Sequence, residues 1–367
     1  MARVKLEDVC ERGSSNLKQS DVVDKDGDYP IYGASGYIGN VDFYHQEQPY
    51  VAVVKDGAGI GRTTLHPAKS SVIGTMQYLL PKDNVLPKYL FYVVSYMHLE
   101  KYFTGATIPH IYFKDYKNEE FNLDLLERQA EIVEILEKCE KIIEKRKQEI
   151  QLLDDLIKAR FVEMFGNPVL NDKGWEQKSL GEITTKIGSG ATPKGGKEAY
   201  QEEGITLIRS MNVHNGQFEY KDLAHISDEQ ASKLDNVTIE EDDVLLNITG
   251  ASVARSCVVP NEILPARVNQ HVCIIRCKDC IIPEFLNKLL IDDNYQDLLW
   301  SIAGSGATRE SITKQQVENL QIILPMLELQ KEFMAFCHQV TKSKVVVQKA
   351  LDETQLLFDS LMQQYFG

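Results

Sequence analysis

One stretch of the chain repeats apolar side chains at the spacing of a coiled-coil seam. Between residues 124 and 166 an apolar residue recurs every seven positions, a second and less regular stripe runs beside it, and charged residues fill most other positions. About forty residues at ~1.5 Å per residue would span roughly 60 Å, which is longer than an ordinary core helix. The pattern predicts one long helix with a packed seam. The two stripes consist of Leu136, Ile143, Ile150, Ile157 and Met164, and of Ile132, Cys139 and Leu153.

The residues at the two ends of this stretch predict where the helix begins and ends. Asp124 can cap the N-terminus, and Glu127 three positions later completes a capping box. Gly166, followed by Asn167 and Pro168, is typical of a helix stop. We therefore expect a helix over residues 124–165.

The same stretch occurs a second time. Adding 201 to each residue number carries it onto residues 326–367, so that Gln129 corresponds to Gln330 and a Phe-Gly pair ends both copies. The register extends back without a gap to Gly-Ala-Thr at 105–107, which matches Gly-Ala-Thr at 306–308. A register shared over this length indicates an internal duplication.

The two seams complement each other. Arg146 and Arg160 interrupt the first seam, whereas their counterparts Val347 and Leu361 continue the second. Two seams within one chain can bury each other. We predict that the two long helices pack antiparallel as an intramolecular coiled coil.

The segments between the helices predict mixed helix and sheet. Each contains strand-like runs and, late in the segment, a helix led by a proline, Pro87 in the first and Pro283 in the second. The predicted fold is α+β, with two similar globular α/β domains that are each followed by a long helix. The strand-like runs are residues 50–54, 77–80, 206–208, 244–248 and 272–275. The predicted boundaries are 1–123 for the first domain, 124–166 for the first helix, 167–325 for the second domain and 326–367 for the second helix.

The two globular segments agree best at a turn that follows a strand. The first turn reads Val-Val-Lys-Asp-Gly-Ala-Gly-Ile-Gly-Arg at residues 53–62, and the second reads Leu-Asn-Ile-Thr-Gly-Ala-Ser-Val-Ala-Arg at residues 246–255. The alignment pairs Arg62 with Arg255. A glycine turn that presents an arginine suits close approach to a phosphate backbone or to a guanine edge.

Other chemical motifs are incomplete. The glycines at 57, 59 and 61 suggest dinucleotide binding, but no helix opens there and no spaced acid follows. Residues 190–197 resemble a phosphate-binding loop only loosely, because the Gly-Lys-Ser/Thr ending is missing. A zinc site at Cys273, Cys277 and Cys280, with His271 nearby, would lack a second Cys-x-x-Cys pair, and Cys273 lies in an alternating apolar run. We therefore expect no cofactor, metal or catalytic residue in this chain.

Composition limits where DNA could bind. The net charge of −14 argues at first sight against a nucleic-acid partner. The charge is uneven, because residues 1–121 carry 13 basic and 15 acidic side chains, whereas residues 167–325 carry 15 and 23. A DNA surface would be a local basic patch on an acidic body. Seven scattered cysteines, no apolar run of membrane length and no signal peptide predict a cytoplasmic protein with reduced thiols.

Several short segments carry a family resemblance. Residues 126–132 (LERQAEI) and 161–168 (FVEMFGNP) are similar to a central spacer, and residues 208–213 (IRSMNV), 245–252 (LLNITGAS) and 268–272 (VNQHV) are similar to target-recognition segments. With them, the whole chain resembles the specificity subunit of type I restriction-modification systems. The first domain matches more loosely, since it has Gly-Ala-Gly-Ile-Gly-Arg where the second has Thr-Gly-Ala-Ser.

The resemblance implies a non-catalytic DNA-recognition subunit. Each target-recognition domain would read one half of a split asymmetric site in double-stranded DNA, and the helix pair would set their spacing against the helical repeat. Two methylation subunits that use S-adenosylmethionine would dock on it to modify adenine. Restriction (motor-nuclease) subunits that use ATP and Mg would cut unmodified DNA. Partner subunits could then supply the phosphate contacts that dominate affinity.

The candidate DNA contacts are polar and basic residues on the turns, because Arg, Asn and Gln can bond bidentately to base edges. A structural or solvated role is the alternative for each of them. In the first domain they are Lys55, Arg62, Lys69, Gln77 and His110, and in the second Arg209, Asn212, Asn247, Thr249, Arg255, Asn269, Gln270 and Arg309.

Two rival interpretations belong to other functional classes. A coiled-coil scaffold joining two protein-binding domains would explain the helices, but not the glycine-arginine turn that both domains share. A nucleotide-dependent enzyme would rest on the glycines at 57, 59 and 61 alone. Salt-dependent binding of duplex DNA tests the first rival, and a ligand-induced melting shift tests the second.

Overall fold

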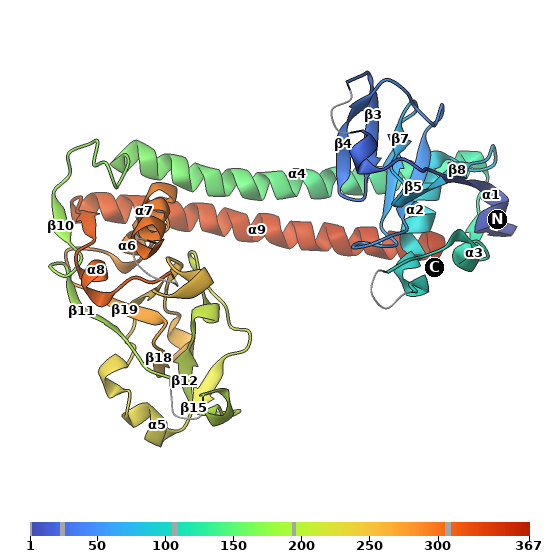
Figure 1. Cartoon of the computed structure of the whole chain (residues 1–367). Coiled ribbons are helices and arrows are strands. Elements are labelled where there is room, and N and C mark those ends of the chain that lie inside the picture. The colour runs from blue at the N-terminus through green and yellow to red at the C-terminus, as the bar shows by residue number, and fades with distance from the viewer. Residues whose placement is uncertain (1, 23–25, 105–108, 193–195, 305–309) are drawn as a thin grey trace. The chain divides into compact units, whose positions relative to one another are not determined.

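The computed structural model describes residues 2–22, 26–104, 109–192, 196–304 and 310–367. The chain divides into two compact units: unit 1 comprises Met1–Glu149 and Val347–Gly367, and unit 2 comprises Ile150–Val346. Each unit contains one globular domain together with part of each of two long helices, α4 (Leu126–Phe165) and α9 (Leu327–Phe366), as Figure 1 shows.

Unit 1 is built around a four-stranded antiparallel sheet against which one helix packs. The sheet has the order β2 (Cys10–Ser14), β8 (Met76–Pro81), β5 (Tyr50–Val54), β6 (Thr63–His66). Helix α2 (Pro87–Tyr96) shares an apolar core with β5 and β8. The remaining elements are β1 (Ala2–Lys5), which pairs with β9 (Glu120–Leu123), the sheet β4 (Gly36–Val41), β3 (Tyr29–Gly33), β7 (Ser71–Val72), and the short helices α1 (Leu6–Val9) and α3 (Phe113–Tyr116).

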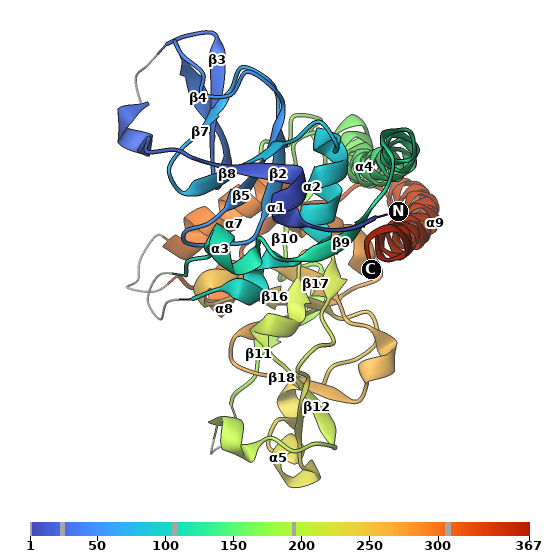
Figure 2. The ribbon, with the colours of Figure 1, turned by 90° about the vertical axis from the view of Figure 1, so that its right-hand side faces the viewer.

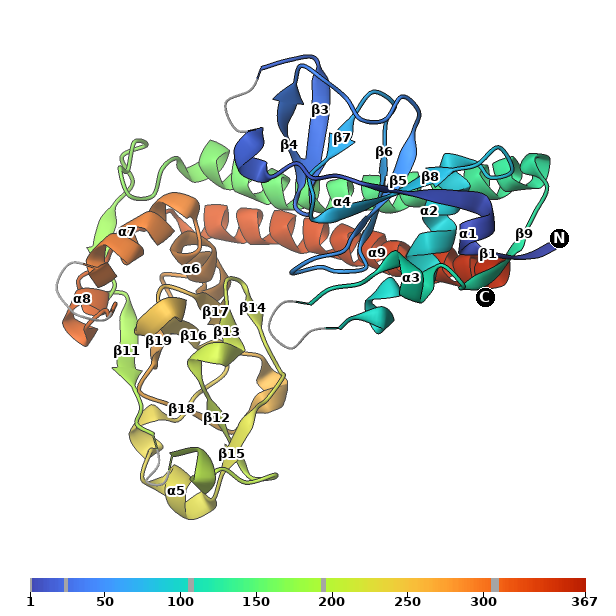
Figure 3. The ribbon, with the colours of Figure 1, turned by 45° about the vertical axis from the view of Figure 1, so that its right-hand side comes forward.

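Unit 2 contains a four-stranded sheet with the corresponding order. It runs β11 (Thr184–Ser189), β19 (Val272–Cys277), β16 (Val244–Asn247), β17 (Ser256–Val258), and helix α6 (Pro283–Leu290) packs on it. A second sheet, β15 (Ala224–Ile226), β12 (Ile205–Ile208), β18 (Ala266–Val268), lies near α5 (Asp228–Ser232) in Figure 3. The other elements are β10 (Gln177–Ser179), which pairs with β20 (Gln321–Ile323), β13 (Val213–His214) with β14 (Gln217–Phe218), α7 (Asp293–Gly304) and α8 (Lys314–Glu318).

The predicted fold class is confirmed. The strand-like runs of the sequence fall on β5, β8, β12, β16 and β19, and the two proline-led helices are α2 and α6. Pro87 and Pro283 stand in the first turn, where the missing amide hydrogen costs nothing because that donor has no partner within a helix. In each unit the central strand, β5 or β16, is buried along its whole length, because it is covered on both faces.

The long helices pack on each other in an antiparallel sense, as predicted. In unit 1 the first half of α4 shares a core with the end of α9, through Leu136 and Met362. In unit 2 the last turns of α4 share a core with the start of α9, where the Phe161 and Phe333 rings lie 5.6 Å apart. Figure 2, which looks along the pair, shows the helices side by side.

Burial along the predicted seam is uneven. Leu136 is fully buried, but Ile150 and Ile157 are only half-buried. There, an ion pair joins the helices, because the Lys344 ammonium donates to both oxygens of the Asp154 carboxylate at 2.6 Å. The seam is therefore apolar near its ends and mixed around residues 150–157.

The predicted N-terminal cap of the first helix is wrong. Helix α4 begins at Leu126, and the buried Asp124 carboxylate accepts a hydrogen bond from the Tyr89 hydroxyl (3.2 Å) instead of from helix amides. Fully buried Gln129 joins this end of the helix to the loop before α2. Its Nε2 donates to the carbonyls of Asp124 and Asn84, both at 2.9 Å, and its Oε1 accepts from the Leu86 amide at 2.8 Å.

The counterpart glutamine makes the same three bonds in unit 2. Gln330 is fully buried, donates to the Pro325 and Cys280 carbonyls and accepts from the Ile282 amide at 2.9 Å. Each glutamine thus satisfies backbone groups that would otherwise be buried unpaired. The internal duplication extends to this side-chain network.

The predicted helix stop is confirmed. Helix α4 ends at Phe165, and Gly166 adopts the left-handed conformation (φ +74°) that glycine takes most easily after a helix. Its amide still donates to the Val162 carbonyl at 2.9 Å.

A buried histidine predicts how the stability of unit 1 depends on pH. His66 is packed between Tyr32 and Tyr50, and burial lowers its pKa from 6.5 to about 4. The unfolded chain therefore binds this proton more tightly than the folded one. The contribution of neutral His66 to the free energy of unfolding of unit 1 should be fully present above pH 6.5. The free energy of unfolding should fall by up to about 3 kcal/mol as the pH drops from 6.5 to 4.

Urea denaturation at a series of pH values measures this effect. His66→Phe should flatten the acid limb of the stability profile, whereas His98→Asn, at an exposed position of the same unit, should leave it as in the parent. An acid limb that is equally steep in the parent and in His66→Phe would contradict this assignment.

Candidate nucleic-acid interface

The two glycine-arginine turns have the same backbone construction. In unit 1 the Val54 amide donates to the Arg62 carbonyl and the Gly61 amide to the Val54 carbonyl, both at 2.9 Å. In unit 2 the Asn247 amide donates to the Arg255 carbonyl (2.8 Å) and the Ala254 amide to the Asn247 carbonyl (2.9 Å). The residue before each arginine is left-handed, with φ +80° at Gly61 and +70° at Ala254.

A second segment closes each turn in the same way. In both turns the amide of the first glycine donates to a carbonyl of this second segment. Gly57 donates to the Pro109 carbonyl at 3.0 Å, and Gly250 donates to the Glu310 carbonyl at 2.9 Å. The residue before the glycine forms an isolated β-bridge with the residue after that carbonyl: Asp56 with His110 in unit 1, and Thr249 with Ser311 in unit 2. The turns are therefore structural equivalents.

The two turn arginines differ in their partners. The exposed Arg62 guanidinium donates to the Ala34 carbonyl in the β3–β4 turn, so it braces its own domain. The partly exposed Arg255 guanidinium has no hydrogen-bond or ion-pair partner among the residues that the structure describes. Arg255 is thus the better candidate for a contact with DNA.

The other basic candidates of unit 1 lie near the same turn or on a loop. The Asp56 carboxylate accepts from His110 Nδ1 at 2.6 Å and lies 3.7 Å from the Lys55 ammonium. The His110 ring stacks on Tyr112. Lys69 is exposed on a turn and has a positive φ of 54°. The Asp56 carboxylate therefore contacts both Lys55 and His110, so neither side chain is free of an acidic neighbour.

Four amide candidates are buried and serve the backbone of their own domain. Asn212 donates to the Glu219 carbonyl (3.0 Å), and Asn247 donates to the Ser210 carbonyl (2.8 Å). The Gln77 amide donates to a backbone carbonyl, and the Asn269 amide oxygen accepts from the His271 amide at 2.9 Å. Each of these residues is at most 5% exposed, so its side chain is not available to a base edge without rearrangement. The affected candidates are Gln77, Asn212, Asn247 and Asn269.

Two arginine candidates remain. The Arg209 guanidinium donates to the Asp222 carbonyl and lies over the Tyr200 ring, 5.4 Å from its centre. It is half-buried, so part of its surface stays accessible. Arg309 lies outside the described residues, as do both copies of Gly-Ala-Thr at 105–107 and 306–308.

The structure brings together a polar cluster on the exposed edge of unit 2. Gln270 and His271 stand in the β18–β19 turn, Thr249 follows β16, and Thr192 follows β11. The Thr192 hydroxyl donates to Gln270 Oε1, Gln270 Nε2 lies 3.1 Å from His271 Nε2, and His271 Nδ1 bonds with the Thr249 hydroxyl. Sequence reasoning chose Gln270 and Thr249 but missed Thr192 and His271. In the sequence, His271 stood in the VNQHV segment and near the three cysteines considered for zinc, and neither place marked it as a DNA contact.

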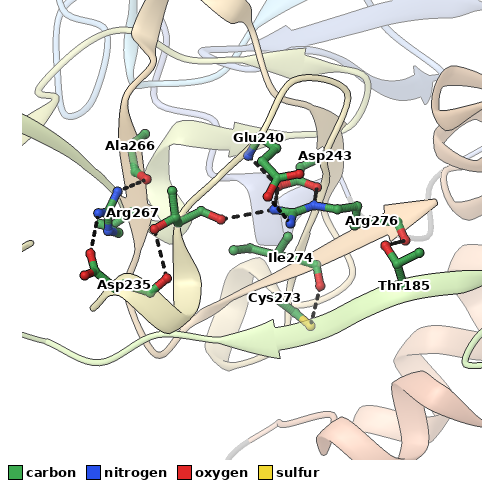
Figure 4. Close-up of polar contacts among 10 residues, drawn as sticks. Thr185, Asp235, Glu240, Asp243, Ala266, Arg267, Cys273, Ile274 and Arg276 are labelled. Atoms are coloured by element: carbon green, nitrogen blue, oxygen red, sulfur yellow. Dashed lines mark hydrogen bonds and ion pairs between the residues drawn. The ribbon is translucent and has the colours of Figure 1, made fainter. Parts of the chain in front are cut away.

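Two arginines that no sequence pattern singled out, buried Arg267 and half-buried Arg276, bond within their own domain. The Arg276 guanidinium binds both oxygens of the Asp243 carboxylate at 2.8 Å, and Arg267 binds Asp235 at 2.8 Å (Figure 4). Asp243 is fully buried. Hydrogen bonding to Asp243 raises the pKa of Arg276, so the guanidinium stays charged. These arginines stabilise unit 2 and are not free to bind phosphate.

The described residues show neither a metal cluster nor a membrane helix. Among them, no group of three or more His, Cys, Asp or Glu side chains could hold a metal ion. Burial raises the pKa values of the Cys273 and Cys277 thiols to about 12, which disfavours the thiolate that zinc binding needs. No helix in the described part of the chain is long and apolar enough to cross a membrane.

Comparison with known proteins identifies the family to which this architecture belongs. The family model of the type I restriction modification DNA specificity domain matches the chain twice, at residues 1–152 and 172–353. This chain belongs to the type I specificity-subunit family. Each of the two matched segments contains one of the two equivalent turns. The type I restriction enzyme MjaIX specificity subunit of Methanocaldococcus jannaschii is 24% identical over 307 residues, which cover 77% of this chain and 69% of that protein.

Solved structures of specificity subunits show the same fold. The type I restriction-modification S subunit of M. genitalium matches with a TM-score of 0.63 and 15% identity, over 100% of this chain and 96% of that one. A chain from a structure on complex assembly and conformational transition of the type I restriction-modification system matches with a TM-score of 0.62 and 16% identity, over 99% and 97%. The specificity-subunit fold therefore covers the full length of this chain.

Proposed function

We propose that this specificity subunit recognises a split site in double-stranded DNA, with each globular domain reading one half. The observation that carries the proposal is the pair of equivalent turns, one in each copy of a duplicated domain. A duplicated reader supports a two-part site, because each copy can contact one half. The differing side chains at the equivalent positions, Asp56 in unit 1 and Thr249 in unit 2, support halves of different sequence.

The long helices support a spacing role. Each contains 40 residues, which corresponds to roughly 60 Å of helix. A rigid pair of this length can hold two readers at a set separation along the duplex, where the helical repeat is about 34–36 Å. In this proposal the number of unread base pairs between the half-sites depends on the helices.

The chemistry belongs to partner subunits in this proposal. Two methylation subunits would bring S-adenosylmethionine, and restriction subunits would bring ATP and Mg, whereas this chain would supply recognition alone. Apolar side chains that are left exposed on the helices support docking of a protein partner. In unit 2, Leu152, Leu156, Val345 and Val346 are 66%, 45%, 63% and 68% exposed.

Arg255→Ala tests the proposed DNA surface. The guanidinium has no partner among the described residues, so its loss should leave the melting temperature of unit 2 within about one degree or two of the parent. Duplex binding by the assembled methylation complex should weaken. A base contact would cost ~1–3 kcal/mol at one position of one half-site, and a phosphate contact would lower the salt slope by about one unit.

Arg62→Ala is the matched control, because that arginine already bonds within its own domain. It should change affinity less than Arg255→Ala does. Equal affinity of the parent and Arg255→Ala for cognate and random duplexes, at every salt concentration, would remove the turn of unit 2 from the DNA surface. Absence of salt-dependent duplex binding by the parent complex would favour the scaffold interpretation.

A further inference from the structure

Both ends of the Gln270 amide group have a side-chain partner, Thr192 at the oxygen and His271 at the nitrogen. Its side chain is exposed at the β18–β19 turn. Thr192, from the loop after β11, donates its hydroxyl hydrogen to Gln270 Oε1. On the other side, His271 Nε2 lies 3.1 Å from Gln270 Nε2, and His271 Nδ1 is bonded to the Thr249 hydroxyl of the glycine-arginine turn. The amide plane of an exposed glutamine is thus fixed, which a solvated side chain would not require.

The backbone around Gln270 is built to hold this arrangement. The Asn269 amide oxygen accepts from the His271 amide at 2.9 Å, which shapes the turn, and the Ile248 amide donates to the His271 carbonyl at 2.9 Å. Gly190 donates its amide to the Asn269 carbonyl at 3.1 Å. A Cβ at Gly190 would lie 1.7 Å from the Val268 carbonyl oxygen, so only glycine allows this loop to approach the turn.

A count of donors and acceptors shows what the held amide can still bind. A glutamine side chain has two N–H donors and an oxygen with two lone pairs. Thr192 occupies one lone pair, and His271 occupies one N–H. One N–H donor and one oxygen lone pair therefore remain on the same amide group. If the Gln270 amide is turned over, so that its oxygen and nitrogen change places, Thr192 and His271 exchange their donor and acceptor roles. One free N–H and one free lone pair still remain.

An adjacent donor and acceptor match one base edge in the major groove. Adenine presents its N7 acceptor beside its N6 amino donor, and a glutamine amide can bond to both at once. Guanine presents two acceptors at the corresponding edge, which would leave the glutamine oxygen facing an acceptor. The chemistry of the held amide therefore selects adenine.

We propose that Gln270 reads one adenine of the half-site bound by unit 2, and that Thr192 and His271 are positioning residues for its amide. The inference rests on the proposed DNA-recognition function and adds a base to it. Thr249 joins this set to the glycine-arginine turn through its bond with His271. The same turn carries Arg255, whose guanidinium has no hydrogen-bond or ion-pair partner among the described residues.

Base analogues test the assignment directly. Each adenine of the half-site, on either strand, is replaced in turn by 7-deazaadenine, which pairs normally but lacks the N7 acceptor. Duplex affinity is measured with the assembled methylation complex. The parent should lose about tenfold in affinity at one adenine. Gln270→Ala should bind the natural site more weakly and should show no further loss when that adenine is replaced.

The positioning residues are tested by the same readout. Thr192→Val and His271→Phe should reduce the analogue effect at that one adenine while the melting temperature of unit 2 stays near that of the parent. Thr192→Ser keeps the hydroxyl and should restore the full effect. A structural role alone would lower the melting temperature without removing the sensitivity at a single adenine.

The outcomes separate this inference from the proposed function. If the parent complex binds a split site but Gln270→Ala keeps the full analogue effect at every adenine, the base assignment is overturned and DNA recognition stands. A half-site without any adenine sensitive to the analogue would also overturn it. If the parent complex shows no preference for any duplex sequence, the proposed function itself fails.

Discussion

Arg276→Met is expected to cost unit 2 about 3–5 kcal/mol of folding free energy, because it leaves a buried carboxylate without its counter-ion. Asp243 is fully buried, and its two oxygens accept from Arg276 Nε and Nη2 at 2.8 Å (Figure 4). Arg276 Nη2 also donates to the Thr238 carbonyl at 3.1 Å. The remaining Asp243 carboxylate would keep one bond from the Glu240 amide, which does not offset its desolvation.

Urea denaturation of the variant measures the loss. Lys233→Met is the matched control, since the Lys233–Glu229 pair lies in the same unit with both side chains mostly exposed and should contribute under ~1 kcal/mol. A double variant, Arg276→Met with Asp243→Leu, should recover much of the lost stability by removing the unpaired charge. The explanation fails if Arg276→Met unfolds at the same urea concentration as the parent.

Leu136→Asp is expected to have the second large effect, a loss of several kcal/mol in unit 1. Leu136 is fully buried where α4 and α9 share a core with α2, and a carboxylate there would have neither water nor a counter-ion. Ile150→Asp should cost less, because Ile150 is only half-buried. The free energy of unfolding should therefore be highest for the parent, lower for Ile150→Asp and lowest for Leu136→Asp.

Lys141→Asp serves as the control for charge, since Lys141 is exposed on the same helix. It should change stability by no more than about 0.5 kcal/mol. If Leu136→Asp melted like Lys141→Asp, the assignment of Leu136 to the buried end of the seam would be wrong. Circular dichroism melts of the three variants decide this.

The regular parts of the molecule could be predicted from the sequence because their patterns are local. A seven-residue apolar repeat gives the direction of a helix face without any knowledge of its partner, which is why the α4–α9 pair was predicted. The seam's half-buried middle was not predicted. Whether Ile150 is covered depends on what packs around the pair, and the Lys344–Asp154 bond joins residues 190 positions apart.

The candidate site was predicted less well, because residue type does not reveal what a polar side chain bonds to. Asn247 and Gln270 are both amides near predicted turns, yet one is fully buried on a backbone carbonyl and the other is exposed. The alignment of Arg62 with Arg255 was correct, but the Ala34 carbonyl that occupies Arg62 comes from a segment 28 residues away. Such contacts follow from tertiary packing and leave no periodic signal.

The central claim is that the two domains read separate halves of one DNA site. Methylation mapping of host DNA, with and without this gene, tests it most directly when it is combined with replacement of residues 170–320 by the matching domain of a relative. We predict that one split asymmetric adenine motif disappears with the gene, and that the replacement changes one half of the motif and leaves the other unchanged. A motif that persists without the gene, or a replacement that alters both halves or neither, would contradict the account.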